Sequence, residues 1–271
     1  MKVSMHVTGE FALILSSSSI VLPMALKWIA GRLESKRIWT DGLFTVSICC
    51  PGVAAFEPGQ FFQIGLPLPE KHLHRPYSAA SPYSDVLEFY IVRVDGGALT
   101  PLLWDLPVGE LIDVSEKATG SFTLSHVPAL KSIWLVATGT GLAPYIAMLR
   151  DPAIWERYEK IVLVQGVRHA RDLAYLDELA DYQTRYALKF RYVSSTSRDI
   201  SPNALSGRIT TRLSDGSLEH AAGNTISPAD TTVMLCGNPD MLNEMESILE
   251  GRGLERQRAK HPGQIIVERY W

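Results

Sequence analysis

Two spacings of apolar residues alternate along the second half of this chain. Short continuous apolar runs, which are typical of strands buried on both faces of a parallel sheet, occupy residues 133–137, 161–165, 189–193 and 232–236. Apolar residues recur at helical spacing over residues 142–150, 173–186 and 240–251. Strands that alternate with helices predict an α/β domain with a doubly wound parallel sheet, which we place at residues 128–271. The loops at the carboxyl ends of its strands should converge on one ligand site.

The first half of the chain shows a different pattern. Short runs rich in β-branched and aromatic residues fall at residues 43–50, 60–66, 86–94 and 110–114, with glycine- and proline-containing turns between them. This pattern predicts a small antiparallel β-barrel, which we place at residues 31–127. Thr100 and Pro101 suit a helix N-cap and a first helical position, so one short helix at 99–106 is expected to cap the barrel.

The first thirty residues fit neither domain. Residues 11–30 are apolar in bulk, but a serine run at 16–19, Pro23 and Lys27 interrupt them. A membrane span needs about 20 predominantly apolar residues, and an export signal needs a basic start and a small-residue cleavage site. Neither requirement is clearly met. We therefore expect residues 1–30 to be a weakly ordered extension, and membrane attachment is disfavoured.

Composition narrows the class of protein further. The chain has 271 residues and is 46% hydrophobic, which is enough for two cores. A formal net charge of -3 argues against nucleic acid as the main partner. Cys49, Cys50 and Cys236 are too few for a four-cysteine iron–sulfur cluster or a disulfide framework. A cytoplasmic location is expected, because the cytoplasm keeps cysteines reduced.

A glycine turn joins the first parallel strand to its helix. Gly139, Thr140 and Gly141 follow the strand, and Pro144 suits the first helical turn. Glycines allow the backbone to close on a phosphate, and the amino terminus of the following helix offers free N–H groups to that anion. Pro144 stands where a Rossmann fingerprint has glycine or alanine, so this is a nucleotide-type turn of another kind.

The barrel half carries the tetrapeptide Arg75-Pro76-Tyr77-Ser78. An arginine can bind a diphosphate, a tyrosine ring can lie against a flat heteroaromatic ring, and a serine hydroxyl can bond a ring nitrogen. A flavin dinucleotide needs all three. Taken alone, the tetrapeptide is better explained as a strand end with an exposed arginine and a packed tyrosine. Its order relative to other motifs is needed to support a flavin site.

Four motifs stand in one order along the chain: residues 75–78, 139–144, 236–239 (Cys-Gly-Asn-Pro) and the terminal 268–271 (Glu-Arg-Tyr-Trp). In this order the chain resembles the plant-type ferredoxin–NADP reductase family, and within it the bacterial ferredoxin/flavodoxin–NADP reductases, over residues 36–271. In that family the first motif binds FAD and the second binds the NADP diphosphate. The third lies near the nicotinamide, and the chain ends at the flavin.

The resemblance implies roles for the flavin-site residues. Arg75 would bind the FAD diphosphate together with the Thr100 helix start and the Gly120-Ser121 turn, while Tyr77 would face the isoalloxazine ring. Tyr270 would stack on that ring and act as a gate for nicotinamide, and Trp271 would lie against the adenine. The full set implied for FAD is Arg75, Pro76, Tyr77, Ser78, Tyr90, Val92, Thr100, Gly120, Ser121, Tyr270 and Trp271.

Catalytic roles follow from the same resemblance. Ser78 would hydrogen-bond near the reactive N5 of the flavin. Cys236 would line the nicotinamide pocket, and Glu268 would be a proton or charge partner beside it. With Tyr270 these residues form the expected catalytic set, although a lone cysteine after a buried strand is usually only a small core residue.

Charge favours NADP over NAD. A 2′-phosphate requires arginines and hydroxyls, whereas an NAD site usually places a carboxylate against the ribose. Arg168 follows the second parallel strand, Ser197 and Arg198 follow the third, and no acidic residue lies in the turn 165–168. Solvated surface arginines are the plainer explanation for any one of them. The set expected to bind NADP is Thr140, Gly141, Arg168, Ser197, Arg198, Arg208, Gly237 and Asn238.

The resemblance implies hydride transfer between NADPH and FAD, followed by single-electron exchange with ferredoxin or flavodoxin. Such carriers are acidic, so a basic docking face is expected. Two clusters are candidates, one at Lys27, Arg32, Lys36 and Arg37 and one at Arg252, Arg256, Arg258 and Lys260, although such runs are often just solvated surface.

Other functions share this fold. A flavin reductase or the reductase component of an oxygenase is one alternative, and a non-catalytic flavin subunit of an electron-transfer complex is another. The shortage of cysteines for a cluster disfavours the last. We expect a monomer.

Overall fold

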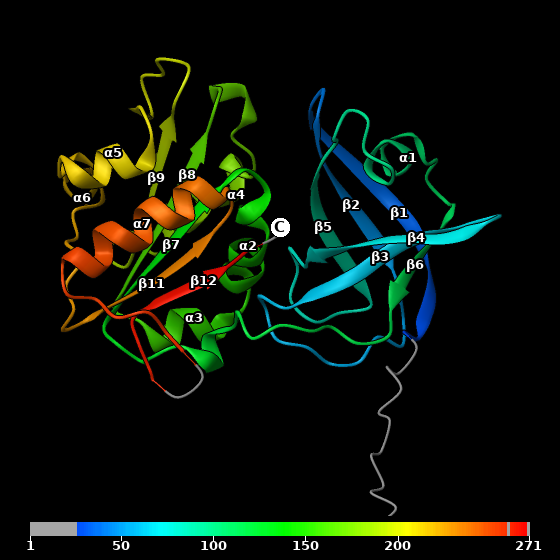
Figure 1. Cartoon of the computed structure of the whole chain (residues 1–271), viewed down its shortest axis with the longest axis horizontal. Helices are drawn as coiled ribbons and strands as arrows, with labels where there is room; N and C mark the ends of the chain where they lie inside the picture. Colours follow the sequence, from blue (N-terminus) through cyan, green and yellow to red (C-terminus); the bar gives the residue numbers. More distant parts are fainter. Residues whose placement is uncertain (1–25, 259–260, 270–271) are drawn as a thin grey trace, which may run out of the picture.

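The computed structural model of the chain describes residues 26–258 and 261–269. Lys260, Tyr270, Trp271 and most of the expected extension lie outside the described residues. Figure 1 shows two sheets side by side, one built from the first half of the chain and one from the second. This arrangement confirms the predicted two-domain fold class.

The first domain is an antiparallel six-stranded sheet with strand order β4-β3-β6-β1-β2-β5. An isolated bridge between Ala79, which directly follows β4, and Phe89 in the middle of β5 closes the curled sheet into a barrel. Phe44, Phe62 and Phe89 are buried in its core. The strands are β1 (Trp28–Thr40), β2 (Leu43–Cys49), β3 (Phe61–Leu68), β4 (Lys71–Ser78), β5 (Val86–Val92) and β6 (Leu111–Ser115).

Strand β1 begins at Trp28, so the last three residues of the expected extension belong to the barrel. Register shifts in its pairing with β2, at Leu33/Ser35 and Ile38/Thr40, break the two-residue alternation that marks a strand in sequence. Gly31 lies where a Cβ would be 2.6 Å from the side chain of Ile48, so the strand needs glycine there.

Helix α1 (Thr100–Asp105) caps the barrel, as expected, but it begins differently. Leu99 occupies the N-cap position, so the assignment of Thr100 as N-cap is wrong. The Thr100 hydroxyl instead accepts a hydrogen bond of 2.8 Å from the backbone N–H of Val94. Its side chain is used to hold the loop after β5 against the helix, which leaves it unable to cap.

The second domain contains a parallel six-stranded sheet with strand order β10-β9-β8-β7-β11-β12. The chain runs outward from β7 through β8 to β9 and then returns to the other side of β7 at β11, so the sheet is doubly wound. The strands are β7 (Ser132–Thr138), β8 (Lys160–Val167), β9 (Phe190–Thr196), β10 (Leu205–Ser206), β11 (Thr231–Cys236) and β12 (Ile265–Glu268).

Helices cover both faces of this sheet. Alternate residues of β7 divide between two cores: Ile133 and Leu135 pack with α2, α3 and α4, whereas Trp134 and Val136 pack with α5, α6 and α7. The helices are α2 (Ala143–Arg150), α3 (Pro152–Arg157), α4 (Leu176–Arg185), α5 (Ile209–Ser214), α6 (Ser217–Ala222) and α7 (Pro239–Gly251), with short 3-10 turns η1 (Leu124–His126), η2 (Gly139–Leu142) and η3 (Ala170–Asp172). No helix among the described residues is long and apolar enough to span a membrane.

Polar contacts lock the two domains together. The guanidinium of Arg150 on α2 donates to Glu88 of the barrel at 2.8 Å and to Glu178 on α4 at 2.8 and 2.9 Å. Tyr175 has a φ of 61° and its hydroxyl reaches across to the hydroxyl of Thr45 in the barrel at 2.9 Å. Such directional contacts fix the angle between the domains, and so the shape of the space between them.

Candidate active site

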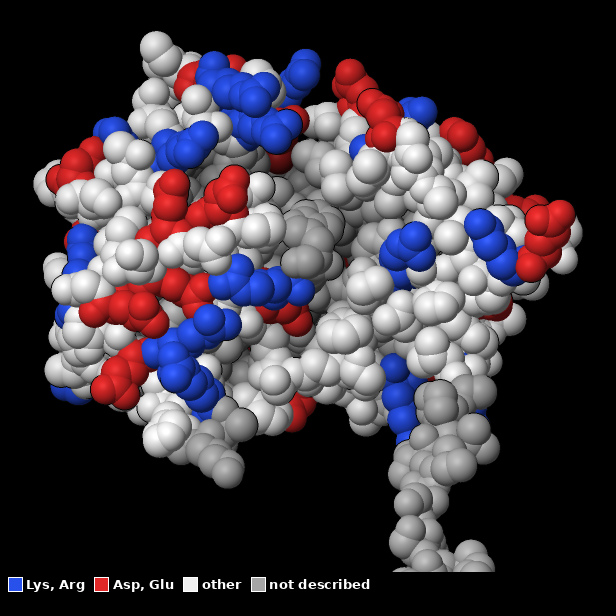
Figure 2. Space-filling model, in the orientation of Figure 1, with Lys and Arg blue, Asp and Glu red and all other residues white. Residues whose placement is uncertain are grey.

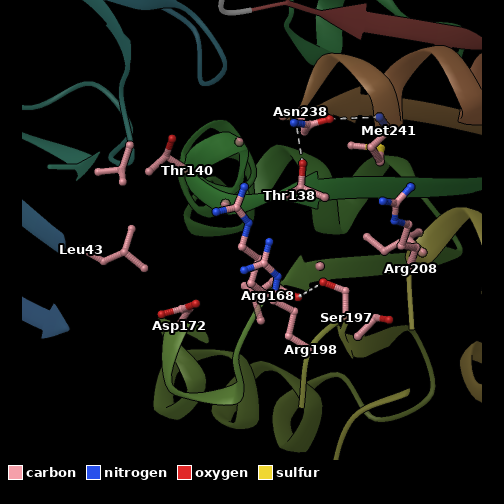
Figure 3. Close-up of a pocket in the computed structure, with 18 of the residues that line it drawn as sticks. Leu43, Thr138, Thr140, Arg168, Asp172, Ser197, Arg198, Arg208, Asn238 and Met241 are labelled. Carbon is pink, nitrogen blue, oxygen red and sulfur yellow. Dashed lines mark hydrogen bonds between the residues drawn. The ribbon is translucent and has the colours of Figure 1, made fainter. Parts of the chain in front are cut away.

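A large cavity lies at the carboxyl ends of the parallel strands. Its volume is about 940 Å³, and the loops after β7, β8, β9 and β11 all contribute to its wall, as the topology predicted. The barrel forms the opposite wall with residues 40–43, Val92 and Asp95. Figure 3 shows the cavity, with Leu43 on the barrel side and Arg168, Arg198 and Arg208 on the sheet side.

The two glycines of the turn after β7 have different tasks. Gly139 has a φ of 54°, and a Cβ built there would meet no atom within 4 Å, so its backbone faces open space. A Cβ on Gly141 would lie 2.4 Å from the carbonyl oxygen of Cys236 and 2.9 Å from the nitrogen of Gly237. Gly141 is therefore required for packing the β7 turn against the β11 turn, rather than for approach to a phosphate.

Thr138 connects the same two turns, and no motif in the sequence marks it as a site residue. Its hydroxyl accepts a 2.8 Å hydrogen bond from the backbone N–H of Asn238. Gly237 has a φ of 137°, and a Cβ there would lie 2.2 Å from that hydroxyl. The Asn238 side chain accepts from the N–H groups of Asp240 and Met241, so it caps α7. Gly237 and Asn238 both line the large cavity, as expected.

Arginines gather at the end of the large cavity formed by the β8 and β9 loops. All four predicted residues, Arg168, Ser197, Arg198 and Arg208, line it. Figure 3 shows Arg168 and Arg198 next to each other, with Arg208 on the far side of Ser197. Arg171 lines the cavity as well and was missed, because it falls in η3 with no pattern to distinguish it from a surface arginine.

Carboxylates also line this cavity, at Asp41, Asp95, Asp172, Asp240 and Glu244. Glu244 lies 4.0 Å from Arg208 in an ion pair whose arginine side chain is 74% exposed. A pair this exposed is weak. Arg208 can therefore leave it for a stronger anion such as a phosphate.

A smaller cavity of about 300 Å³ lies between β4 and β5. Seven of the residues expected to bind FAD line it: Arg75, Pro76, Tyr77, Ser78, Tyr90, Val92 and Thr100. Arg75 is exposed and donates to the carbonyl of His74 at 2.7 Å, which leaves other N–H groups of its guanidinium for a ligand. The hydroxyl of Tyr90 is buried without a hydrogen-bond partner among the described residues.

Two expected FAD residues lie apart from this cavity. Gly120 and Ser121 line neither cavity and are exposed. Gly120 packs beside the ring of Phe61, and a Cβ there would be 3.9 Å from Glu268. The turn is thus close to the catalytic set, whereas the structure does not bring it to Arg75 and Thr100 at the cavity wall.

The two cavities meet near a partly buried carboxyl group. Val92 and Thr140 line both of them. Near this junction the hydroxyl of Ser78 donates to Glu268 at 3.2 Å, and the Cys236 sulfur lies 3.9 Å from the same carboxyl oxygen. Three of the four predicted catalytic residues are therefore together, and the fourth, Tyr270, lies outside the described residues.

Sheet register explains this convergence. Cys236 and Glu268 are paired at the carboxyl ends of β11 and β12, and Ser78 ends β4 on the barrel side. Burial raises the pKa of Glu268 to about 7, although the hydrogen bonds from Ser78 and Cys236 act in the opposite direction. A carboxyl group with this pKa can gain or lose a proton near neutral pH.

The two predicted basic clusters are largely occupied by local contacts. In the first, Lys36 donates to the carbonyls of Trp104 and Leu106, and the Arg37 guanidinium lies 3.7 Å from the centre of the Trp39 ring. In the second, Arg252 pairs with Glu219 and Arg256 pairs with Glu246, at 2.9 and 3.0 Å. Figure 2 shows basic and acidic residues intermixed over the visible face of the α/β domain, on the left of the view. Neither cluster is a purely cationic face.

Comparison with known proteins places this geometry in a family. Residues 135–247 match the family described as an oxidoreductase NAD-binding domain. The chain is 35% identical over 246 residues to a flavodoxin/ferredoxin–NADP reductase of Escherichia coli, with 90% of this chain and 99% of the relative covered. It is 37% identical over 248 residues to a ferredoxin–NADP reductase of Azotobacter vinelandii, with 88% and 95% covered.

A solved structure agrees with these relatives. A ferredoxin–NADP+ reductase from Neisseria gonorrhoeae, crystallised with FAD and NADP, superposes with a TM-score of 0.86 at 30% identity, covering 90% of this chain and 99% of that one. The resemblance deduced from the four motifs is thus confirmed. The chain belongs to the bacterial flavodoxin/ferredoxin–NADP reductase family.

Proposed function

We propose that this protein is an FAD-dependent ferredoxin/flavodoxin–NADP+ oxidoreductase. It transfers a hydride between NADPH and FAD and exchanges single electrons with ferredoxin or flavodoxin. The observation that supports this most directly is the shared wall at Val92 and Thr140, which joins a cavity suited to FAD to a cavity suited to NADPH. A two-cofactor reaction requires its two reacting rings to meet at such a junction.

The smaller cavity fits FAD. The Arg75 guanidinium supplies N–H groups for a diphosphate, and the half-buried Tyr77 supplies a flat apolar surface for the isoalloxazine ring. The buried Tyr90 hydroxyl, which has no partner among the described residues, is a group that a ligand would satisfy. FAD supplies the chemistry that converts transfer of an electron pair into transfer of single electrons.

The larger cavity fits NADP(H). Thr140 and Gly141 belong to the turn after β7, where Gly139 leaves the backbone open to an approaching diphosphate. Arg168 and Arg198, with Arg208 opposite, offer the positive charge that a 2′-phosphate requires. The sheet end of the cavity therefore binds the adenosine half of NADPH, and its barrel end receives the nicotinamide.

Three side chains at the junction control the reacting edge. The Ser78 hydroxyl donates a hydrogen bond to Glu268, and by rotating it can donate to a ring nitrogen instead. Glu268, with a pKa of about 7, holds or releases that proton at neutral pH. Cys236 bounds the nicotinamide pocket with a buried sulfur. We also propose that Tyr270 acts as a gate for nicotinamide and that Trp271 lies against the adenine of FAD.

The test is an anaerobic titration of the FAD-loaded protein. One equivalent of NADPH should bleach the yellow flavin, and oxidised ferredoxin or flavodoxin should then restore the colour. A colourless protein that refuses added FAD would contradict the proposal. Faster reoxidation by free FMN than by either carrier would make the protein a flavin reductase instead.

We include a cytoplasmic location and a monomeric state in the proposal. No disulfide joins the three cysteines, and Cys50 and Cys236 are buried, as suits a reducing compartment. Size-exclusion chromatography with light scattering measures the oligomeric state directly.

A further inference from the structure

Two of the cavity arginines are each followed in the sequence by a side chain that lines neither cavity. His169 follows Arg168 in the β8 loop, and Asp199 follows Arg198 in the β9 loop. The Nδ1 atom of His169 lies 2.8 Å from one carboxyl oxygen of Asp199. The backbone N–H of Ala170 donates to the other oxygen at 2.8 Å. One carboxylate thus holds both a side chain and a backbone amide of the neighbouring loop.

Backbone hydrogen bonds continue this connection up to the arginines. The N–H of Arg198 donates to the carbonyl of Arg168 at 2.9 Å, and the N–H of Ser197 donates to Val167 at 3.0 Å. The hydroxyl of Thr196 donates to the carbonyl of Asp199 at 2.8 Å, which fixes the far side of the loop. The spacing between the Arg168 and Arg198 backbones therefore depends on how these two loops are joined.

Apolar packing cannot supply this spacing. No residue in 167–173 or 197–208 is buried, and Ile200 is 93% exposed. Loops without buried side chains take their position from hydrogen bonds and ion pairs. Two guanidinium groups that line one cavity also repel each other, so contacts within the loops that carry them have to hold their separation.

We propose that His169 and Asp199 are a positioning pair that sets the separation of Arg168 and Arg198 and thereby determines preference for the 2′-phosphate of NADPH. This inference rests on the proposed use of NADPH. Neither residue lines the cavity, so the pair acts through the arginines. NADH lacks the 2′-phosphate, so its binding should be insensitive to the pair.

Asn offers a precise test of the His169 contact. An asparagine amide nitrogen occupies roughly the place of the histidine Nδ1, so His169→Asn keeps a donor toward Asp199 and His169→Ala removes it. Asp199→Ala removes the acceptor. Asp151→Ala is the matched control, because Asp151 also accepts a backbone N–H at 2.8 Å, from Ala153, but lies outside both cavities.

The experiment uses the FAD-loaded full chain with ferricyanide as electron acceptor. Losing one charge-assisted hydrogen bond in His169→Ala should raise the KM for NADPH about tenfold, and losing two in Asp199→Ala should raise it at least as much. The KM for NADH and both kcat values should stay within about twofold, and His169→Asn and Asp151→Ala should behave like the wild type. The dissociation constant of 2′-phospho-AMP, measured by calorimetry, should likewise rise about tenfold in the two alanine variants of the pair. The dissociation constant of AMP should stay within about twofold of the wild-type value.

Other results would contradict either the positioning role or the proposed function. Equal increases in KM for NADPH and NADH, or failure of His169→Asn to restore the NADPH value, would overturn the positioning role. Unchanged NADPH kinetics in both alanine variants would also overturn it. A wild-type protein that shows no preference for NADPH over NADH would instead contradict the proposed function itself.

Discussion

The partly buried carboxyl group of Glu268 should make this protein less stable as the pH rises through neutrality. The perturbation that tests this is Glu268→Gln, which removes the charge while the amide oxygen still accepts the hydrogen bond from Ser78. Glu268 is partly buried next to Ser78, which lines the smaller cavity, and this burial raises its pKa from 4.5 to about 7. The measurement should be made on the protein free of FAD, because the raised pKa is that of Glu268 in the chain without a cofactor.

The free energy of unfolding falls with rising pH because the folded protein holds the Glu268 proton more tightly than the unfolded chain does. Below pH 4.5, the ordinary value, the carboxyl group is neutral in the folded and unfolded states, and its burial is then at its most favourable. Between pH 4.5 and about 7 the unfolded chain loses the proton while the folded protein keeps it, so stability falls. Above that range both states are charged, and the folded state carries the full penalty of a buried charge.

The magnitude follows from the same shift. Each pKa unit corresponds to about 1.4 kcal/mol, so the change from 4.5 to about 7 gives an upper limit of about 3 kcal/mol. The glutamine variant should match the wild type near pH 4.5 and exceed its free energy of unfolding by up to about 3 kcal/mol at pH 8.

Urea unfolding followed by tryptophan fluorescence, repeated between pH 4.5 and 8, measures the difference. Glu250→Gln, on the exposed side of α7, is the control for replacing a glutamate and should give a curve parallel to the wild type. A curve for Glu268→Gln that also runs parallel to the wild type would refute the reasoning, because the carboxyl group would then titrate alike in both states.

Three further predictions follow from other contacts. Arg150→Met should destabilise the protein by about 3 kcal/mol in urea, because it leaves two partly buried carboxylates without their cation. Gly141→Ala should lower both the melting temperature and the affinity for NADPH, because its Cβ would lie 2.4 Å from the Cys236 carbonyl oxygen. Ser78→Ala should slow flavin reduction by NADPH in single-turnover stopped flow more than it weakens FAD binding, and unchanged reduction would remove its role.

The sequence predicted the parts of the fold that follow a simple period. The apolar runs located β7, β8, β9 and β11, and the rule for strand ends then placed their loops around one cavity. Strand β1 was not predicted, and β4 was considered only as a strand end at residues 75–78. Only Gly31 and Leu33 are buried in β1, and only Leu73 and Ser78 are buried in β4. A strand with two buried side chains shows no alternation in its sequence.

Parts of the site escaped prediction because they depend on neighbours from distant segments. Nothing near Thr138 in the sequence shows that its hydroxyl meets the N–H of Asn238, a hundred positions away. Gly141 belongs to a recognisable motif, but its need for glycine comes from the Cys236 backbone. Motif spacing identifies the residues of a site, whereas the reason for each residue type requires the packing of two turns.

The junction of the two cavities depends on the domain interface, since Val92 belongs to the barrel and Thr140 to the parallel sheet. An interface of apolar side chains alone tolerates sliding, because apolar attraction has no preferred direction. The guanidinium of Arg150, which contacts both domains, and the left-handed backbone of Tyr175, which points its hydroxyl at Thr45, add contacts that hold only at one angle. The relative placement of the two cavities is thus determined by polar groups that line neither of them.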